Sequence, residues 1–91
     1  MDLRAKAIDI RKDIVTLIHH AGTGHIGGDL SVTDILVDLY YKQMNVGPDK
    51  VDDPDRDRFV LSKGHCVEAL YTILADKGFF SKEELRSYSQ Y

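Results

Sequence analysis

The chain has 91 residues, of which 43% are hydrophobic and 30% are charged, as is usual for one small globular domain. Its 12 Lys and Arg against 15 Asp and Glu give a formal charge of −3, which argues against a general nucleic-acid-binding protein and gives no reason to expect an anionic membrane as a partner. No apolar stretch approaches the roughly 20 residues that a membrane-spanning helix needs.

Apolar residues recur every three or four positions at the start of the chain, which predicts an amphipathic helix over about residues 2–20. This helix should stop near Gly22, because four of the seven glycines lie within residues 22–28. The predicted apolar stripe consists of Leu3, Ala7, Ile10, Ile14, Leu17, Ile18 and Ala21.

A second helix is predicted to open at Ser31, which forms a weak capping box with Asp34. Residues 45–57 follow as a polar connection rich in turn residues, and their acidic run lacks the pattern of a calcium-binding loop, so we expect a solvated loop. The core-facing residues expected in the second helix are Val32, Ile35, Leu36, Leu39 and Tyr40.

Residues 58–62 are predicted to form a short strand, because this segment is apolar enough to be buried on both faces. A third helix over about residues 66–77 is nearly apolar all round, with Gly78 as its C-terminal stop. A capping box over residues 81–84 predicts a fourth helix that begins near residue 82.

The predicted fold class is therefore α/β, mostly helical with one short strand. A lone buried strand needs a partner for its backbone groups, and a helix without a polar face needs cover on every side. We expect residues 1–91 to be one incomplete domain, either truncated or completed by other chains.

The first candidate site is His25, which lies inside the glycine-rich segment 24–28. Glycines let the backbone approach a ligand closely, and imidazole has a pKa near neutrality that suits proton transfer or hydrogen bonding to a sugar hydroxyl or carbonyl. The alternative is a glycine-rich helix connection with a solvent-exposed histidine.

The second candidate site is the turn at residues 62–65, between the predicted strand and the third helix. Ligands bind at the carboxyl ends of strands in open α/β sheets, and anions bind at the following helix start, so Lys63 and His65 are candidates to hold a phosphate. The alternative is a purely structural turn that His65 caps. The spacing does not match a Walker phosphate-binding loop.

The remaining histidines and the cysteine favour no further site. His19 and His20 end the first helix, where the helix dipole favours a cation, and the four histidines lack the spacing of a zinc site. Cys66 cannot pair with adjacent His65 on one helix face, and as the single cysteine it cannot form an internal disulfide. With no secretory signal after Met1, these features predict a cytoplasmic protein.

The two Gly-His motifs, in this order and joined by the segment Asp-Arg-Phe-Val-Leu-Ser at residues 57–62, resemble the amino-terminal part of transketolases, particularly the N-terminal subunit of two-chain forms. The resemblance covers essentially the whole chain, and includes Asp-Ile-Leu at 34–36 and Ala-Leu-Tyr at 69–71. Many family members have proline where Ile26 stands here.

The resemblance implies a thiamine-diphosphate enzyme of carbohydrate metabolism that moves a two-carbon ketol unit between sugar phosphates. It assigns His25 to the substrate side, as hydrogen-bond donor and proton shuttle, and His65 to the cofactor diphosphate. The thiazolium ring supplies the carbanion chemistry. Close relatives such as deoxyxylulose-phosphate synthase remain open.

The family's further motifs, which hold a divalent cation such as Mg²⁺ and most of the diphosphate, are not within the 91 residues. We therefore expect a homo- or hetero-oligomer completed by the rest of the transketolase or by a C-terminal subunit, and weak cofactor binding and no turnover by this chain alone. The alternative function is a non-enzymatic helical module that docks a partner or oligomerises.

Overall fold

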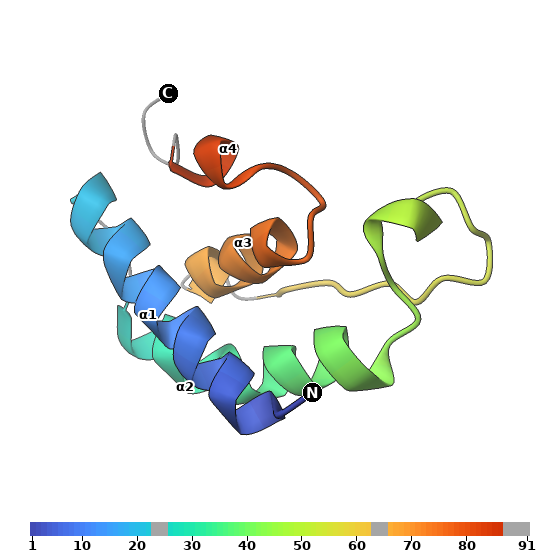
Figure 1. Cartoon of the computed structure of the whole chain (residues 1–91), viewed down its shortest axis with the longest axis horizontal. Coiled ribbons are helices and arrows are strands. Elements are labelled where there is room, and N and C mark those ends of the chain that lie inside the picture. The colour runs from blue at the N-terminus through green and yellow to red at the C-terminus, as the bar shows by residue number, and fades with distance from the viewer. Residues whose placement is uncertain (23–25, 63–65, 87–91) are drawn as a thin grey trace.

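The computed structural model describes residues 1–22, 26–62 and 66–86. Within this part, a π-helical turn, η1, continues the second α-helix, and a short 3-10 turn, η2, lies in the loop after it. In Figure 1 the α-helices pack together, and the loop that includes η2 projects to the right of them. The elements are α1 (Leu3–Ala21), α2 (Ile26–Asp38), η1 (Leu39–Gln43), η2 (Pro48–Lys50), α3 (Val67–Asp76) and α4 (Lys82–Arg86).

Helix α1 begins and ends where the sequence predicts. The Asp2 carboxylate accepts hydrogen bonds from the backbone N–H groups of Arg4, at 3.0 Å, and Ala5, at 3.2 Å, which caps the helix start. Gly22 adopts the left-handed conformation, with φ of 75°, and its N–H donates to the Ile18 carbonyl at 2.9 Å. The predicted stop near Gly22 is confirmed, and the structure adds its cause, because glycine takes positive φ without steric cost.

The core lies where α1, α2 and α3 meet. Four residues of the predicted stripe on α1 are buried, and Leu3 and Ile18 pack against the core. The central cluster consists of Ala7, Ile10, Ile14, Leu36, Val37, Tyr40, Ala69 and Ile73.

Helix α2 begins five residues earlier than the predicted start at Ser31, so Gly27 and Gly28 are helical. The prediction of its buried face was also partly wrong, since Ile35 is 62% exposed while Asp29 and Thr33 are fully buried. A capping preference contributes about 1 kcal/mol, and the buried contacts of α2 outweigh it.

The prediction of a strand at residues 58–62 is wrong. In Figure 1 this segment is a stretched trace without helical turns, and no part of the described chain forms a strand with it. Val60 is 83% exposed, whereas the prediction buried both faces. A strand exists only with a hydrogen-bonded neighbour, and the described residues provide none.

The C-terminal end of α3 and the start of α4 lie where the sequence predicts. Helix α3 stops at Gly78, whose φ is 89°, and two hydrogen bonds close a Schellman motif: Gly78 N–H to the Ala75 carbonyl at 3.0 Å and Phe79 N–H to the Leu74 carbonyl at 2.9 Å. The Ser81 hydroxyl accepts from Glu84 N–H at 3.1 Å and caps α4.

A polar cluster ties α1, η1 and α3 together. The Asp76 carboxylate accepts from Lys6 Nζ at 3.0 Å and from the Tyr41 hydroxyl. Burial by itself raises the pKa of Asp76, but these two hydrogen bonds and the charges of Lys6 and Lys82 outweigh it, so its pKa lies below the ordinary value. Burial, then the bond to Asp76, raises the pKa of Tyr41.

We expect Asp76→Asn to lower the free energy of unfolding by about 1 kcal/mol at pH 7, since it removes an ion pair and weakens a charge-assisted hydrogen bond. Because the folded-state pKa is depressed, the carboxylate stabilises the fold above about pH 4 and loses this effect as the pH falls through the folded-state pKa. Urea unfolding at pH 7 and below pH 3 measures both. A deficit of the same size at both pH values, or an equal deficit for Asp9→Asn at an exposed position of α1, contradicts this assignment.

Candidate functional site

Both predicted site residues, His25 and His65, lie outside the described residues, together with Lys63. The structure does describe the segment directly after each histidine. Helix α2 begins with Ile26, the residue after His25, and α3 begins after its N-cap residue Cys66, the residue after His65. The site can therefore be built from the two helix starts.

A buried hydrogen bond joins these two helix starts. Asp29 is fully buried, and its Oδ1 accepts from the backbone N–H of Ala69 at 2.8 Å. Asp29 is four residues after His25, and Ala69 is four residues after His65. The segments after the two Gly-His motifs are thus held against each other inside the molecule.

Four polar residues of α2 and α3 are buried, and none of them was predicted from the sequence to lie in the core. The Thr33 hydroxyl donates to the Asp29 carbonyl at 2.7 Å, so α2 fixes the residue that caps α3. Glu68 and Thr72 lie one turn apart on α3, and each is 1% exposed. Their positions in the sequence could have indicated this, because one is an aspartate directly after glycines and two are polar residues on an otherwise apolar helix. Burying a polar group costs free energy unless it is hydrogen-bonded, so such residues indicate specific partners.

The start of α3 has the chemistry to hold an anion. A helix N-terminus carries partial positive charge, and here Lys63 and His65 directly precede it in the sequence. The N-cap Cys66 makes no side-chain capping hydrogen bond, while Asp29 takes the Ala69 amide. A cation, an imidazole and a helix start are groups that bind anions, although Asp29 already occupies the Ala69 amide.

Other candidates for chemistry are limited. His19 and His20 are exposed in the last turn of α1, in the place expected for a structural role. Cys66 is fully buried as a free thiol. Across residues 1–22, 26–62 and 66–86, no three His, Cys, Asp or Glu side chains gather closely enough to hold a metal ion.

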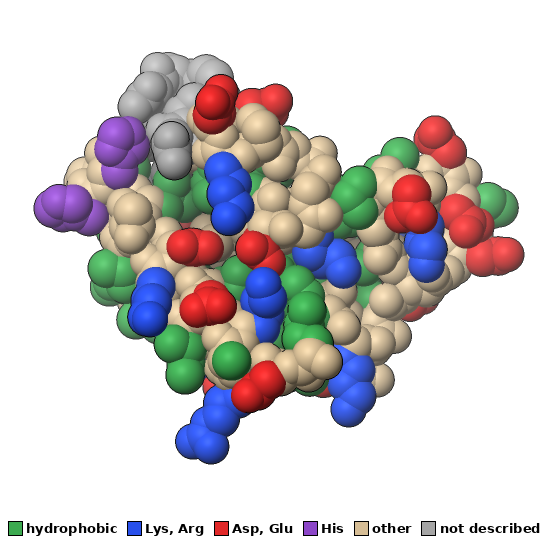
Figure 2. All heavy atoms as spheres, viewed as in Figure 1, with side chains coloured by type: hydrophobic (Ala, Val, Ile, Leu, Met, Phe, Trp, Pro, Cys, Tyr) green, Lys and Arg blue, Asp and Glu red, His purple; other side chains and the backbone are tan. Residues whose placement is uncertain are grey.

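The surface carries both signs of charge. Figure 2 shows basic and acidic side chains interspersed over one face, with acidic side chains gathered over the loop at the right. Asp49, Asp52 and Asp55 are exposed there, which confirms the predicted solvated loop. None of the described helices combines the length and the apolar character needed to cross a membrane.

Comparison with known proteins gives a family match over nearly the whole chain. The family described as "Transketolase, thiamine diphosphate binding domain" matches residues 3–91. The chain is 56% identical over 73 residues to an apulose-4-phosphate transketolase subunit of Phocaeicola vulgatus, covering 80% of this chain and 26% of that protein.

Two further relatives agree. The chain is 46% identical over 85 residues to "6-deoxy-6-sulfo-D-fructose transketolase subunit SqwG" of Clostridium sp., covering 93% of this chain and 31% of that protein. It is 38% identical over 65 residues to the transketolase of Homo sapiens, covering 71% of this chain and 10% of that protein. The chain spans less than a third of the length of these relatives.

Proposed function

We propose that this chain carries one wall of a site that transfers a two-carbon ketol unit between sugar phosphates. The chain belongs to the family of transketolase thiamine diphosphate-binding domains and is a subunit or fragment of a transketolase-family enzyme. The names of the relatives contain different sugars. The proposal therefore extends to the type of transfer and not to one sugar.

The observation that carries this proposal is the buried hydrogen bond between Asp29 and Ala69, 2.8 Å long. It holds together the helix after His25 and the helix after His65. Two imidazole motifs far apart in the sequence can serve one pocket only if the fold brings their flanking segments together. A buried hydrogen bond between those segments supports that requirement.

In this proposal His25 serves the substrate side, where it donates a hydrogen bond to the reacting carbonyl or hydroxyl and moves a proton. His65 holds the diphosphate of the cofactor at the positive end of α3, with Lys63 adding charge. Thiamine diphosphate, when bound with a divalent cation such as Mg²⁺, supplies the stabilised carbanion that the transfer needs. The chain's own residues position the substrate and the cofactor and move a proton at the substrate.

We also propose that another polypeptide or the rest of the enzyme completes the site. Relatives whose names describe them as transketolase subunits support a partner chain. The segment 58–62 supports it as well, because an unpaired stretched backbone with a largely exposed valine is suited to join a sheet from elsewhere.

The test is a chimera in which this chain replaces the matching segment of the Phocaeicola vulgatus protein, assembled with the partner subunit of that enzyme. We expect the assembled chimera to transfer a ketol unit from a ketose phosphate to an aldose phosphate in the presence of thiamine diphosphate and Mg²⁺. Coupled assays of the new ketose measure it. The matched control is the unaltered enzyme.

A chimera that folds, assembles and stays inactive contradicts the proposal. That result supports the alternative of a non-enzymatic interaction module, since assembly would then be intact while chemistry is absent. Size-exclusion chromatography before the assay separates this outcome from simple misfolding.

A further inference from the structure

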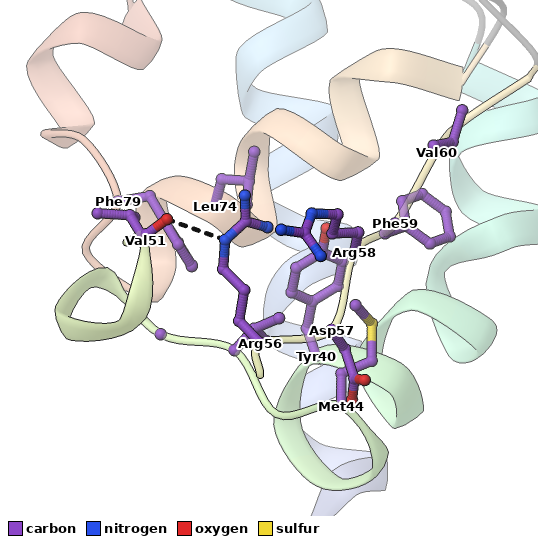
Figure 3. Close-up of a pocket in the computed structure, with 12 residues that line it drawn as sticks. Tyr40, Met44, Val51, Arg56, Asp57, Arg58, Phe59, Val60, Leu74 and Phe79 are labelled. Atoms are coloured by element: carbon purple, nitrogen blue, oxygen red, sulfur yellow. Dashed lines mark hydrogen bonds between the residues drawn. The ribbon is translucent and has the colours of Figure 1, made fainter. Parts of the chain in front are cut away.

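A pocket of about 430 Å³ lies between η1, the projecting loop and the end of α3. This volume falls within the range of small-molecule sites. Figure 3 shows that its lining comes from segments far apart in the sequence, with Tyr40 from η1, Phe59 from the stretched segment and Leu74 from α3. None of the described residues that line the pocket belongs to either Gly-His motif.

Two arginines at this pocket converge, and no carboxylate of the described residues forms an ion pair with either of them. In Figure 3 the guanidinium groups of Arg56 and Arg58 point toward one another, and both residues line the pocket. Arg56 is held in place, because its Nε donates to the Val51 carbonyl at 2.9 Å. Among the described residues, Arg58 has neither an ion pair nor a side-chain hydrogen bond.

The carboxylate that lies between the two arginines in the sequence forms no ion pair with either of them. Asp57 lies between them in the chain, but its Oδ2 accepts from the backbone N–H of Asn45 at 2.7 Å. Figure 3 shows the Asp57 carboxylate directed away from both guanidinium groups, on the side of Met44. Two like charges that converge in this way repel each other, and an anion between them removes the repulsion.

Apart from the two arginines, Asp57 and Gly47, the pocket lining is apolar and aromatic. The Tyr40 and Phe59 rings meet edge to face, with centroids 5.9 Å apart, and Leu74 and Phe79 complete the apolar lining. The Tyr40 hydroxyl has no hydrogen-bond partner among the described residues, so a third polar group is available to a ligand. A simple inorganic anion would leave this apolar surface uncovered.

We propose that this pocket binds a small amphipathic organic anion, whose phosphate or carboxylate bridges Arg56 and Arg58 and whose apolar group packs against Tyr40, Phe59 and Leu74. A ligand of this kind satisfies the two charges and covers the aromatic lining at once. The site is separate from the transfer reaction proposed above and does not rest on it.

The test is calorimetric titration of the full 91-residue chain with four probes: phenyl phosphate, benzoate, inorganic phosphate and benzyl alcohol. We expect phenyl phosphate or benzoate, whichever head group fits, to bind at least about tenfold more tightly than inorganic phosphate or benzyl alcohol. The two anionic ring compounds distinguish a phosphate from a carboxylate head group.

Arg58→Gln should weaken that binding about tenfold, because a charge-assisted hydrogen bond contributes on this scale. Arg58→Lys should recover part of it. Arg4→Gln, at an exposed position of α1, is the matched loss of charge and should leave binding unchanged. Arg58 is exposed, so both variants at this position should keep the unfolding temperature of the parent.

The proposal is overturned if neither anionic ring compound binds. It is also overturned if inorganic phosphate or benzyl alcohol binds as tightly as the anionic ring compounds, or if Arg4→Gln weakens binding as much as Arg58→Gln does. Self-association that Arg58→Gln abolishes, without binding of any probe, assigns the pocket to a second copy of the chain and overturns it as well. Sedimentation velocity detects that case.

Discussion

In the assembled chimera, His25→Ala is expected to lower kcat by about 10²- to 10⁴-fold, the range of general acid–base catalysis, while the affinity for thiamine diphosphate stays close to that of the parent. The reason is the proposed division of roles. An imidazole on the substrate side acts in the transfer itself, and a loss of proton transfer at the reacting atoms lowers turnover without removing contacts to the diphosphate.

His19→Ala is the matched control, because His19 is an exposed histidine in the last turn of α1 and has no role in the proposal. It should retain parental kcat. Equal losses of kcat in the two variants, or a His25→Ala enzyme that keeps full turnover but binds the cofactor poorly, contradict the assignment of His25. Steady-state kinetics at saturating cofactor distinguish these cases.

The sequence was most informative where local chemistry decides the structure. The stop of α1 at Gly22 and the stop of α3 at Gly78 each depend on one glycine with positive φ, and the start of α4 depends on the Ser81 side chain. Such interactions lie within a few residues of each other, and their partners can be read from the chain alone.

The sequence was less informative where distant contacts decide. The start of α2 was placed at Ser31 because the capping pattern is local, whereas the buried bond from Asp29 to Ala69 spans 40 positions. Ile35 was assigned to the core although it is 62% exposed, and Thr33 was left out although its hydroxyl bonds the Asp29 carbonyl only four positions away. A polar residue is excluded from a predicted core unless its distant partner is known.

The predicted strand at residues 58–62 shows a different limit. Composition identified a segment suited to a buried strand, but a strand also needs a neighbour to form hydrogen bonds. Within the described part of the chain no such neighbour exists, so the segment remains stretched and unpaired. Composition therefore indicated that the segment is suited to a strand, but it could not indicate whether a neighbouring strand is present.

The candidate site was predictable in kind but not in detail. The two Gly-His motifs were visible in the sequence, and the family match over residues 3–91 confirms the resemblance that they indicated, while the roles of their histidines stay predictions. The contact that links their flanking helices was not visible, since its partners Asp29 and Ala69 lie 40 positions apart in the sequence. The converging arginines at positions 56 and 58 were likewise missed, because an alternation of Arg and Asp is typical of a solvated loop.

Cofactor binding should depend on assembly to a large extent. A diphosphate is a charge-dense anion that needs several donors and a cation, and the described residues gather no metal-binding group. We expect the isolated 91-residue chain to bind thiamine diphosphate with Mg²⁺ at about millimolar affinity or weaker, and the assembled chimera to bind in the micromolar range.

His65→Ala in the chimera should weaken binding at least about tenfold while kcat at saturating cofactor changes less.

Calorimetric titration of thiamine diphosphate and Mg²⁺ into the isolated chain, the assembled chimera and its His65→Ala variant tests most directly whether this chain holds one wall of a shared cofactor site. Tight binding only after assembly, and its loss with His65, is the predicted result. Micromolar affinity in the isolated chain, or an assembled His65→Ala enzyme with parental affinity, would contradict it.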